Sequence, residues 1–153
     1  MFPSHDHGGA GTYTVKIKGD FPRIYFNNSG DKDKLLEVQS WGDISWKNMS
    51  RAFFGCSNMD VTATDTPNLY SCTDMSLMFI LCTSLIGNSS FNNWVISNIT
   101  SLNTIFYRCF SFNQDLSNWD TSNVTNMNQV FYDTPSDRDW ETSIKNSIKT
   151  CYV

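Results

Sequence analysis

The sequence has little charge and lacks the features that assign many proteins to a class at first sight. Charged residues make up 17% of its 153 positions, the net charge is −4, and Lys and Arg do not cluster. Because phosphate binding needs clustered Lys and Arg, the composition argues against nucleic-acid partners. No apolar run approaches the roughly 20 residues that a membrane-spanning helix needs. The N-terminus lacks the basic and apolar stretches of a signal peptide, so we expect neither a membrane span nor a signal peptide.

Motifs of catalysis and of tight metal binding are also missing. The sequence has no GxSxG, no HExxH, no phosphate-binding glycine loop and no CxxC pair. His5 and His7 flank one aspartate and could hold a metal weakly, but a solvated tail is the simpler interpretation. Asp31 and Asp33 lack the spacing of a calcium loop. We predict a protein that is not an enzyme and that uses no metal and no cofactor.

The residues that are abundant indicate an ordered chain with many turns. Ser, Thr and Asn are frequent, and a polar, weakly charged chain could in principle be disordered. Aromatic residues make up 14% of the chain, however, which is more than disorder allows. Asn, Ser and Thr side chains bond readily to nearby backbone groups, so their frequency favours a turn-rich fold with a core of large side chains.

A repeat of about 25 residues organises the middle of the chain. Residues 41–53 (WGDISWKNMSRAF), 94–106 (WVISNITSLNTIF) and 119–131 (WDTSNVTNMNQVF) align with one another. A fourth copy, residues 67–79 (PNLYSCTDMSLMF), has Pro67 in place of Trp. The repeats therefore start at positions 41, 67, 94 and 119. One unit cannot bury its apolar side alone, whereas stacked units can, and this predicts a repeat solenoid.

Each repeat carries the pattern of a short helix followed by a short strand. Three apolar columns, which include the Met or Leu and the Phe of each copy, have the spacing of one helix face. Directly before them stand four residues that are favoured helix N-caps: Asn48, Asp74, Ser101 and Asn126. We therefore predict a helix that begins at this column and an extended segment that leads to the next repeat.

The cysteines divide into a column and two outliers. Cys56, Cys82 and Cys109 share one phase of the repeat, which favours a buried row of small apolar thiols over a redox or metal site. Cys72 and Cys151 lie outside that row, and a disulfide between them stays open. With an odd number of cysteines, a complete disulfide framework is not expected.

At these residues the chain resembles the BspA-like leucine-rich-repeat surface proteins. Residues 109–131 (CFSFNQDLSNWDTSNVTNMNQVF) follow that repeat almost position for position, and the resemblance covers about residues 35–134. It implies an α+β repeat solenoid, a leucine-rich-repeat-like stack of short strand plus short helix units. It also implies an extracellular or cell-surface protein that acts in adhesion, by binding proteins or components of cell surfaces or matrix.

Two caps complete the expected organisation. Residues 13–17 alternate apolar and polar side chains, as a half-buried strand does, and they resemble the last strand of an immunoglobulin-like or PKD-like sandwich. Residues 1–34 are thus predicted to form an N-terminal strand or β-hairpin cap, ahead of the repeats at 35–134. In residues 135–153, Trp140, Ile144 and Ile148 have helical spacing, which predicts a C-terminal helical cap.

A candidate binding face follows the repeated Phe directly. It consists of one column of large side chains, Phe54, Ile80, Tyr107 and Tyr132, together with Arg51 and Arg108 beside it. An exposed aromatic stripe suits recognition, whereas a second core row is the alternative. The leading hypothesis is a binding or adhesion module. The alternative is a structural spacer, or a stalk segment of a larger surface or virion protein, that has no ligand of its own.

Overall fold

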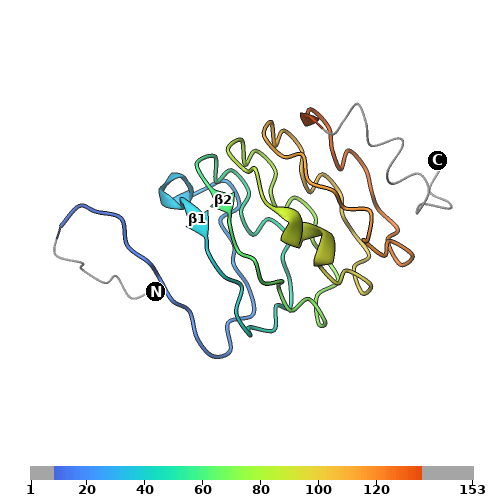
Figure 1. The fold of residues 1–153 in the computed structure, drawn as a ribbon, viewed down its shortest axis with the longest axis horizontal. Helices are drawn as coiled ribbons and strands as arrows, with labels where there is room; N and C mark the ends of the chain where they lie inside the picture. The colour runs from blue at the N-terminus through green and yellow to red at the C-terminus, as the bar shows by residue number, and fades with distance from the viewer. Residues whose placement is uncertain (1–8, 136–153) are drawn as a thin grey trace.

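The computed structural model describes residues 9–135, in which the repeats form successive coils that lie side by side (Figure 1). Regular elements are short and few. In chain order they are the 3-10 turn η1 (Lys32–Lys34), strand β1 (Glu37–Val38), strand β2 (Asp60–Val61) and the 3-10 helix η2 (Ser89–Asn93). The strands β1 and β2 pair in parallel, with Val38 opposite Val61. Most of each coil is therefore held by turns and by contacts with its neighbours.

The predicted α+β fold class is wrong. The longest helix in residues 9–135 is the five-residue η2, and the sheet there has only the two strands β1 and β2. The coils are thus not leucine-rich-repeat-like units of one strand and one helix. The β-hairpin predicted for the N-terminal cap is also wrong, since residues 9–34 contain no strand. Except for residue 135, the segment assigned to a C-terminal helical cap lies outside the described residues.

Backbone hydrogen bonds between neighbouring coils take the place of the predicted helix. Over a seven-residue segment of each of the first three repeats, every second N–H group donates to a carbonyl of the next repeat, at N···O distances of 2.8–3.1 Å. In the first repeat the donors are Met49, Arg51, Phe53 and Gly55, and the acceptors are Asp74, Ser76, Met78 and Ile80. The same ladder joins the second repeat to the third and the third to the fourth. An α-helix would use these N–H groups within its own turn, so the ladder and the helix exclude each other.

Left-handed backbone conformations allow this ladder and interrupt any helix. One residue at the same position of each repeat has a positive φ between 51° and 58°: Arg51, Leu77, Thr104 and Gln129. Four positions later a second such column follows: Gly55, Leu81, Arg108 and Asp133. A left-handed residue reverses the direction of the turn, so a right-handed helix cannot pass through it.

The residues expected to cap helices do cap turns. The Asn48 side-chain oxygen accepts from the Ser50 N–H at 2.8 Å, and the Asp74 carboxylate accepts from the Ser76 N–H at 2.8 Å. This is the bond that an N-cap makes. The side-chain bonds of a cap are present at these positions, but the predicted helix is not, because the chain turns back at the left-handed residue.

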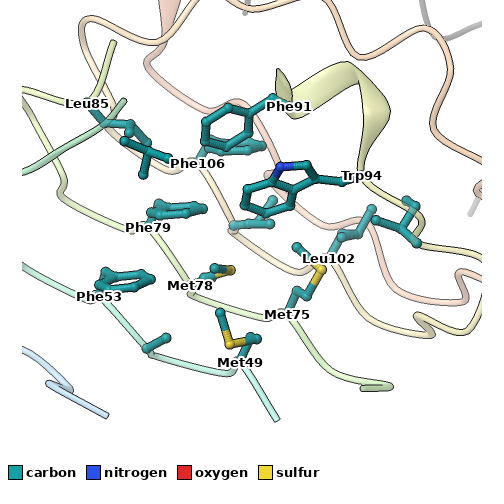
Figure 2. Close-up of a cluster of buried hydrophobic side chains, with 14 of the residues drawn as sticks. Met49, Phe53, Met75, Met78, Phe79, Leu85, Phe91, Trp94, Leu102 and Phe106 are labelled. Carbon is teal, nitrogen blue, oxygen red and sulfur yellow. The ribbon is translucent and has the colours of Figure 1, made fainter. Parts of the chain in front are cut away.

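Rows of identical or similar side chains fill the interior of the stack. Phe53, Phe79, Phe106 and Phe131 are buried and stack face to face, with centroids 5.4–5.7 Å apart and ring planes within 9° of parallel. Figure 2 shows the first three of these rings beside the row of Met49, Met75 and Leu102. Each coil contributes one rung to each row, so the repeat phase found in the sequence sets the core.

The exceptional Pro67 changes the packing of the tryptophans. Without an indole in the second repeat, Trp41 of the first repeat and Trp94 of the third meet edge to face, with centroids 5.3 Å apart and planes at 88°. Phe91 from η2 stacks on Trp94 at 4.5 Å. The gap left by Pro67 is thereby filled with aromatic rings.

Residues 23–28 cover the N-terminal side of the first repeat. The Phe26 N–H donates to the Ala52 carbonyl at 3.1 Å and the Asn28 N–H donates to the Phe54 carbonyl at 2.8 Å, which extends the ladder by one rung. Phe26 is half-buried and packs against the core. Gly55 has a φ of +79°, and a Cβ at this position would collide with the Asn28 side-chain oxygen. Glycine at position 55 therefore leaves room for the Asn28 side chain beside the first repeat. None of the helices in the described part of the chain has the length and hydropathy to cross a membrane.

A candidate binding face along the stacked coils

The backbone turns place the candidate column at the surface edge of the core. Each of its four residues follows the buried Phe and precedes the second left-handed residue of its repeat. Phe54, Ile80 and Tyr107 are half-buried, whereas Tyr132 is 45% exposed. The column is thus covered in part along the first three coils and opens to solvent at the fourth.

Two tyrosines and an ion pair form the exposed end of the column. Tyr107 and Tyr132 stack with centroids 4.9 Å apart and planes at 9°, and neither hydroxyl bonds to another residue in 9–135. The Arg108 guanidinium lies 5.6 Å from the Tyr107 ring centroid, and its Nε lies 3.4 Å from an Asp133 carboxylate oxygen. Both charged side chains are about half exposed, so the pair contributes only about 0–1 kcal/mol to stability.

The six candidate residues do not form one compact patch. Arg108 lies with Tyr107 and Tyr132 at the C-terminal end of the described stack. Arg51 and Phe54 lie in the first repeat, where the Arg51 carbonyl accepts from Asn27 of the covering segment at 3.3 Å. The end built around Tyr132 is the better candidate, because Tyr132 and Arg108 are exposed and lie beside the half-buried Tyr107.

Sequence reasoning missed Asp133 as the partner of Arg108. The two residues occupy the same phase of successive repeats, directly after Tyr107 and Tyr132. Stacking of coils brings residues of one phase next to each other, so the alignment of the repeats already contained this signal. The charged pair also distinguishes this end of the column from the first two repeats, which have Gly55 and Leu81 at the equivalent position.

The cysteine row is buried, as predicted. Cys56, Cys82 and Cys109 are each fully buried, and the Cys82 and Cys109 thiols donate to backbone carbonyls at 3.1 Å and 2.9 Å. Burial raises the pKa of the Cys56 thiol to about 12 and raises the pKa of the other two as well. Cys72 is a buried, free cysteine, and Cys151 lies outside the described residues. Thiols in this state are poor nucleophiles and poor metal ligands, so the row is structural.

The Asp65 carboxylate accepts hydrogen bonds from backbone groups of the first repeat. Burial alone would raise the pKa of Asp65, but hydrogen bonds from the N–H groups of Trp41 and Gly42, together with Ser40, outweigh it and hold that pKa below its usual range. These bonds tie the start of the first repeat to the residues just before the second repeat. Asp65 thus acts as a clamp between coils.

Metal-ligand clusters are not found in the described residues. Asp31 pairs with Lys34 and Asp33 pairs with Lys32, each at 2.8 Å, so both carboxylates have cationic partners. His5 and His7 lie outside the described residues. One shallow apolar depression occurs near the C-terminal end of the stack; its lining has no titratable side chain and includes Leu102, Trp119, Met127 and Phe131.

Comparison with known proteins places the chain in one family. No match was found among curated proteins or among solved structures. The family described as "Mycoplasma protein of unknown function, DUF285" matches residues 47–151, which is more than two thirds of the chain and includes the repeats from within the first copy onward. The chain therefore belongs to this family, the Mycoplasma proteins of unknown function, DUF285.

Proposed function

We propose that this chain is a non-catalytic repeat module, secreted or displayed at a cell surface, that binds proteins and so mediates adhesion. The observation that carries the proposal is the exposed end of the column, where Tyr107, Tyr132 and Arg108 lie together on a closely packed stack. Tyrosine and arginine are enriched among the residues that dominate protein–protein affinity. The resemblance of the repeats to BspA-like surface proteins supports the proposed location and role.

The stacking geometry favours a protein partner over a glycan. Tyr107 and Tyr132 cover each other's facing ring surfaces, since the planes are only 9° from parallel. Each ring thus loses one face to the other, and the pair offers ring edges, hydroxyl groups and only its outer ring faces to an incoming surface. Phenol hydroxyls donate hydrogen bonds to carbonyl and carboxylate oxygens, which a protein surface supplies. Sugar rings and nucleic-acid bases stack on open aromatic faces, and the pairing removes two of the four faces that the separate rings would offer.

The spacer hypothesis has its own support in the backbone ladder. At least four backbone N–H···O bonds run from each of the first three repeats to the next, which makes the stack a stiff, extendable unit. A stalk segment without a ligand would need that stiffness and nothing more. Binding measurements therefore have to separate the two proposals.

The decisive experiment is a binding screen of the purified chain against a defined panel of matrix proteins, with soluble glycans as a second panel. The test variant is Tyr107→Ser combined with Tyr132→Ser. The matched control is Tyr70→Ser, because Tyr70 is 83% exposed and lies outside the column. Circular dichroism and urea unfolding establish that each variant is folded.

Saturable binding to a protein that Tyr107→Ser/Tyr132→Ser abolishes and Tyr70→Ser preserves would support the proposal. Equal loss in both variants would move the contact away from the column. Absence of binding across both panels by a well-folded chain would favour the spacer. Binding confined to glycans would contradict the argument from ring edges.

A further inference from the structure

The exposed end of the column carries hydrogen-bond donors that find no acceptor within residues 9–135. The Tyr107 and Tyr132 hydroxyl groups make no hydrogen bond with a described residue. In the same part of the chain, the buried polar side-chain atoms that lack a partner are all tryptophan nitrogens, so both hydroxyls reach solvent. The Arg108 guanidinium pairs with the Asp133 carboxylate through Nε, and its two Nη groups bond to no described residue. Three donor groups are therefore open to a partner.

The side chains that carry these donors lie close together. The Tyr107 and Tyr132 ring centroids are 4.9 Å apart, and the Arg108 Cζ lies 5.6 Å from the Tyr107 centroid. Both tyrosines hold the same position of successive repeats and their rings are nearly parallel, so their hydroxyls emerge at the same edge of the stack. Acidic side chains three or four positions apart on a helix have a similar separation, about 5–6 Å between Cβ atoms. Two neighbouring carboxylates thus match the spacing of these donors.

The chemistry of the donors selects an anionic acceptor. A guanidinium has five N–H donors and no acceptor, and it binds carboxylates in a bidentate manner. Asp133 contacts Arg108 through Nε alone, at 3.4 Å, so the edge formed by the Nη groups remains for a second carboxylate. Hydrogen bonds from a hydroxyl to an ionised oxygen are also shorter and stronger than those to a neutral one. A basic partner would find only Asp133 to pair with, and Arg108 would repel it.

We infer that the partner presents two neighbouring acidic side chains to this end of the column, one to the Nη edge of Arg108 and one to the tyrosine hydroxyls. This inference rests on the proposed function and names the chemistry of its partner. The net charge of −4 opposes an acidic partner at long range. At an ionic strength of about 0.15 M, however, screening limits that effect to about 8 Å, so the donors at the contact decide the outcome.

An NMR titration of the full ¹⁵N-labelled chain with a capped triglutamate peptide tests the inference. The readout is the set of backbone amide resonances of residues 106–109 and 131–134. We expect saturable shifts with a dissociation constant of about 1 mM, and weaker binding as the salt concentration rises from about 0.05 M to about 0.5 M. A capped triglutamine peptide has nearly the same shape without the charge and should cause no saturable shift.

Two variants test the donors. Arg108→Gln should weaken triglutamate binding at least about 10-fold, because it removes the charged, bidentate donor. Lys34→Gln is the matched control: it also removes one positive charge, but from an exposed side chain of η1, outside the column, and should leave binding unchanged. Tyr107→Phe combined with Tyr132→Phe keeps both rings and removes both hydroxyls, and should weaken binding about two- to ten-fold. Urea unfolding establishes that each variant keeps the stability of the parent within about 1 kcal/mol.

Asp133→Asn should have the opposite effect on binding. It removes the carboxylate that competes for Arg108, so triglutamate should bind about two- to five-fold more tightly. The matched control is Asp31→Asn, since Asp31 is exposed, pairs with Lys34 and lies outside the column. An equal gain in both variants would show that net charge alone drives binding, and this would overturn the inference.

Triglutamate that causes no saturable shift up to about 10 mM, ten times the expected dissociation constant, would overturn the inference. Equal effects of triglutamate and triglutamine, or equal losses in Arg108→Gln and Lys34→Gln, would overturn it too. Sialyllactose that binds in place of triglutamate would move the carboxylate from a protein to a glycan and would also contradict it. Matrix proteins can still bind through Tyr107 and Tyr132 when triglutamate fails, so the failure of this inference is distinguishable from the failure of the proposed function.

Discussion

Replacement of Gln129 by glycine tests the backbone of the repeat directly. Gln129 is exposed and has a φ of 51°, in the left-handed region. Its side chain makes no hydrogen bond with another described residue. The substitution therefore removes almost no packing and acts mainly on the backbone. If position 129 is a left-handed turn, the substitution should raise the free energy of unfolding, whereas in a helix it should lower it.

The magnitude follows from two opposing effects. A non-glycine residue in the left-handed region costs about 1–2 kcal/mol relative to its right-handed conformation. Glycine loses more backbone entropy on folding, about 0.5–1 kcal/mol relative to alanine. The difference predicts that Gln129→Gly raises the free energy of unfolding by about 0.5–1 kcal/mol. If position 129 were helical, the same substitution would lower that free energy by a similar amount.

Urea denaturation of the two variants Gln129→Gly and Asn128→Gly provides the assay. Asn128 is the neighbouring exposed residue, and its φ is not positive. Its backbone groups keep their bonds to Thr104 and Asn126 in the glycine variant. Asn128→Gly should therefore lose about 0.5–1 kcal/mol. Destabilisation by both variants to the same extent would refute the left-handed turn and restore the helical interpretation of this segment.

Three further predictions concern the core, the thiols and the clamp. Phe106→Ala removes a buried ring that stacks on Phe79 and Phe131, so it should lower the free energy of unfolding by about 3–5 kcal/mol. The control is Phe110→Ala at an exposed position, which should change that free energy by about 0.5 kcal/mol or less. Urea denaturation measures both effects. The four described cysteines are buried, so a thiol reagent at about pH 8 should reach them only after denaturant is added; rapid labelling of the native Cys151→Ser chain would contradict this. Because hydrogen bonds lower the pKa of folded Asp65, its contribution is present at neutral pH and is lost as the pH falls through that lowered pKa. Asp65→Asn should therefore be less stable than the parent at about pH 7 and should lose less stability on acidification to about pH 3; parallel pH profiles would exclude the clamp.

The buried rows could be predicted from the sequence, because the same kinds of apolar residue recur at the same position of each repeat. The rows of Phe and of Met and Leu, together with the cysteine row, required only the alignment of copies that start at 41, 67, 94 and 119. Large apolar side chains that recur once per coil must share one interior, whatever path the backbone takes between them. The covering rung at Phe26 was missed because the segment before the first Trp lacks the other columns of the repeat.

The path of the backbone could not be predicted in the same way. Helix and turn share their first step, an Asn or Asp side chain that accepts from the N–H two residues on, as at Asn48 and Asp74. They differ only afterwards, when the N–H groups bond either within the turn or to the next coil. Neither Leu77 nor Thr104 is a residue type that favours a positive φ, so nothing local marks the reversal. The bonds that decide it join residues about 25 positions apart.

The same argument explains how much of the candidate face could be predicted. The column of Phe54, Ile80, Tyr107 and Tyr132 is a property of phase, so the alignment found it. The exposure of the column depends on the conformation of the turn. Left-handed residues before and after the column place these side chains at the edge of the core. The pairing of Arg108 with Asp133 again follows from phase, since both residues stand one position after the column. In a stack of this kind, neighbours across coils can be predicted by subtracting one repeat length, whereas the fraction of each side chain that faces solvent depends on backbone conformation.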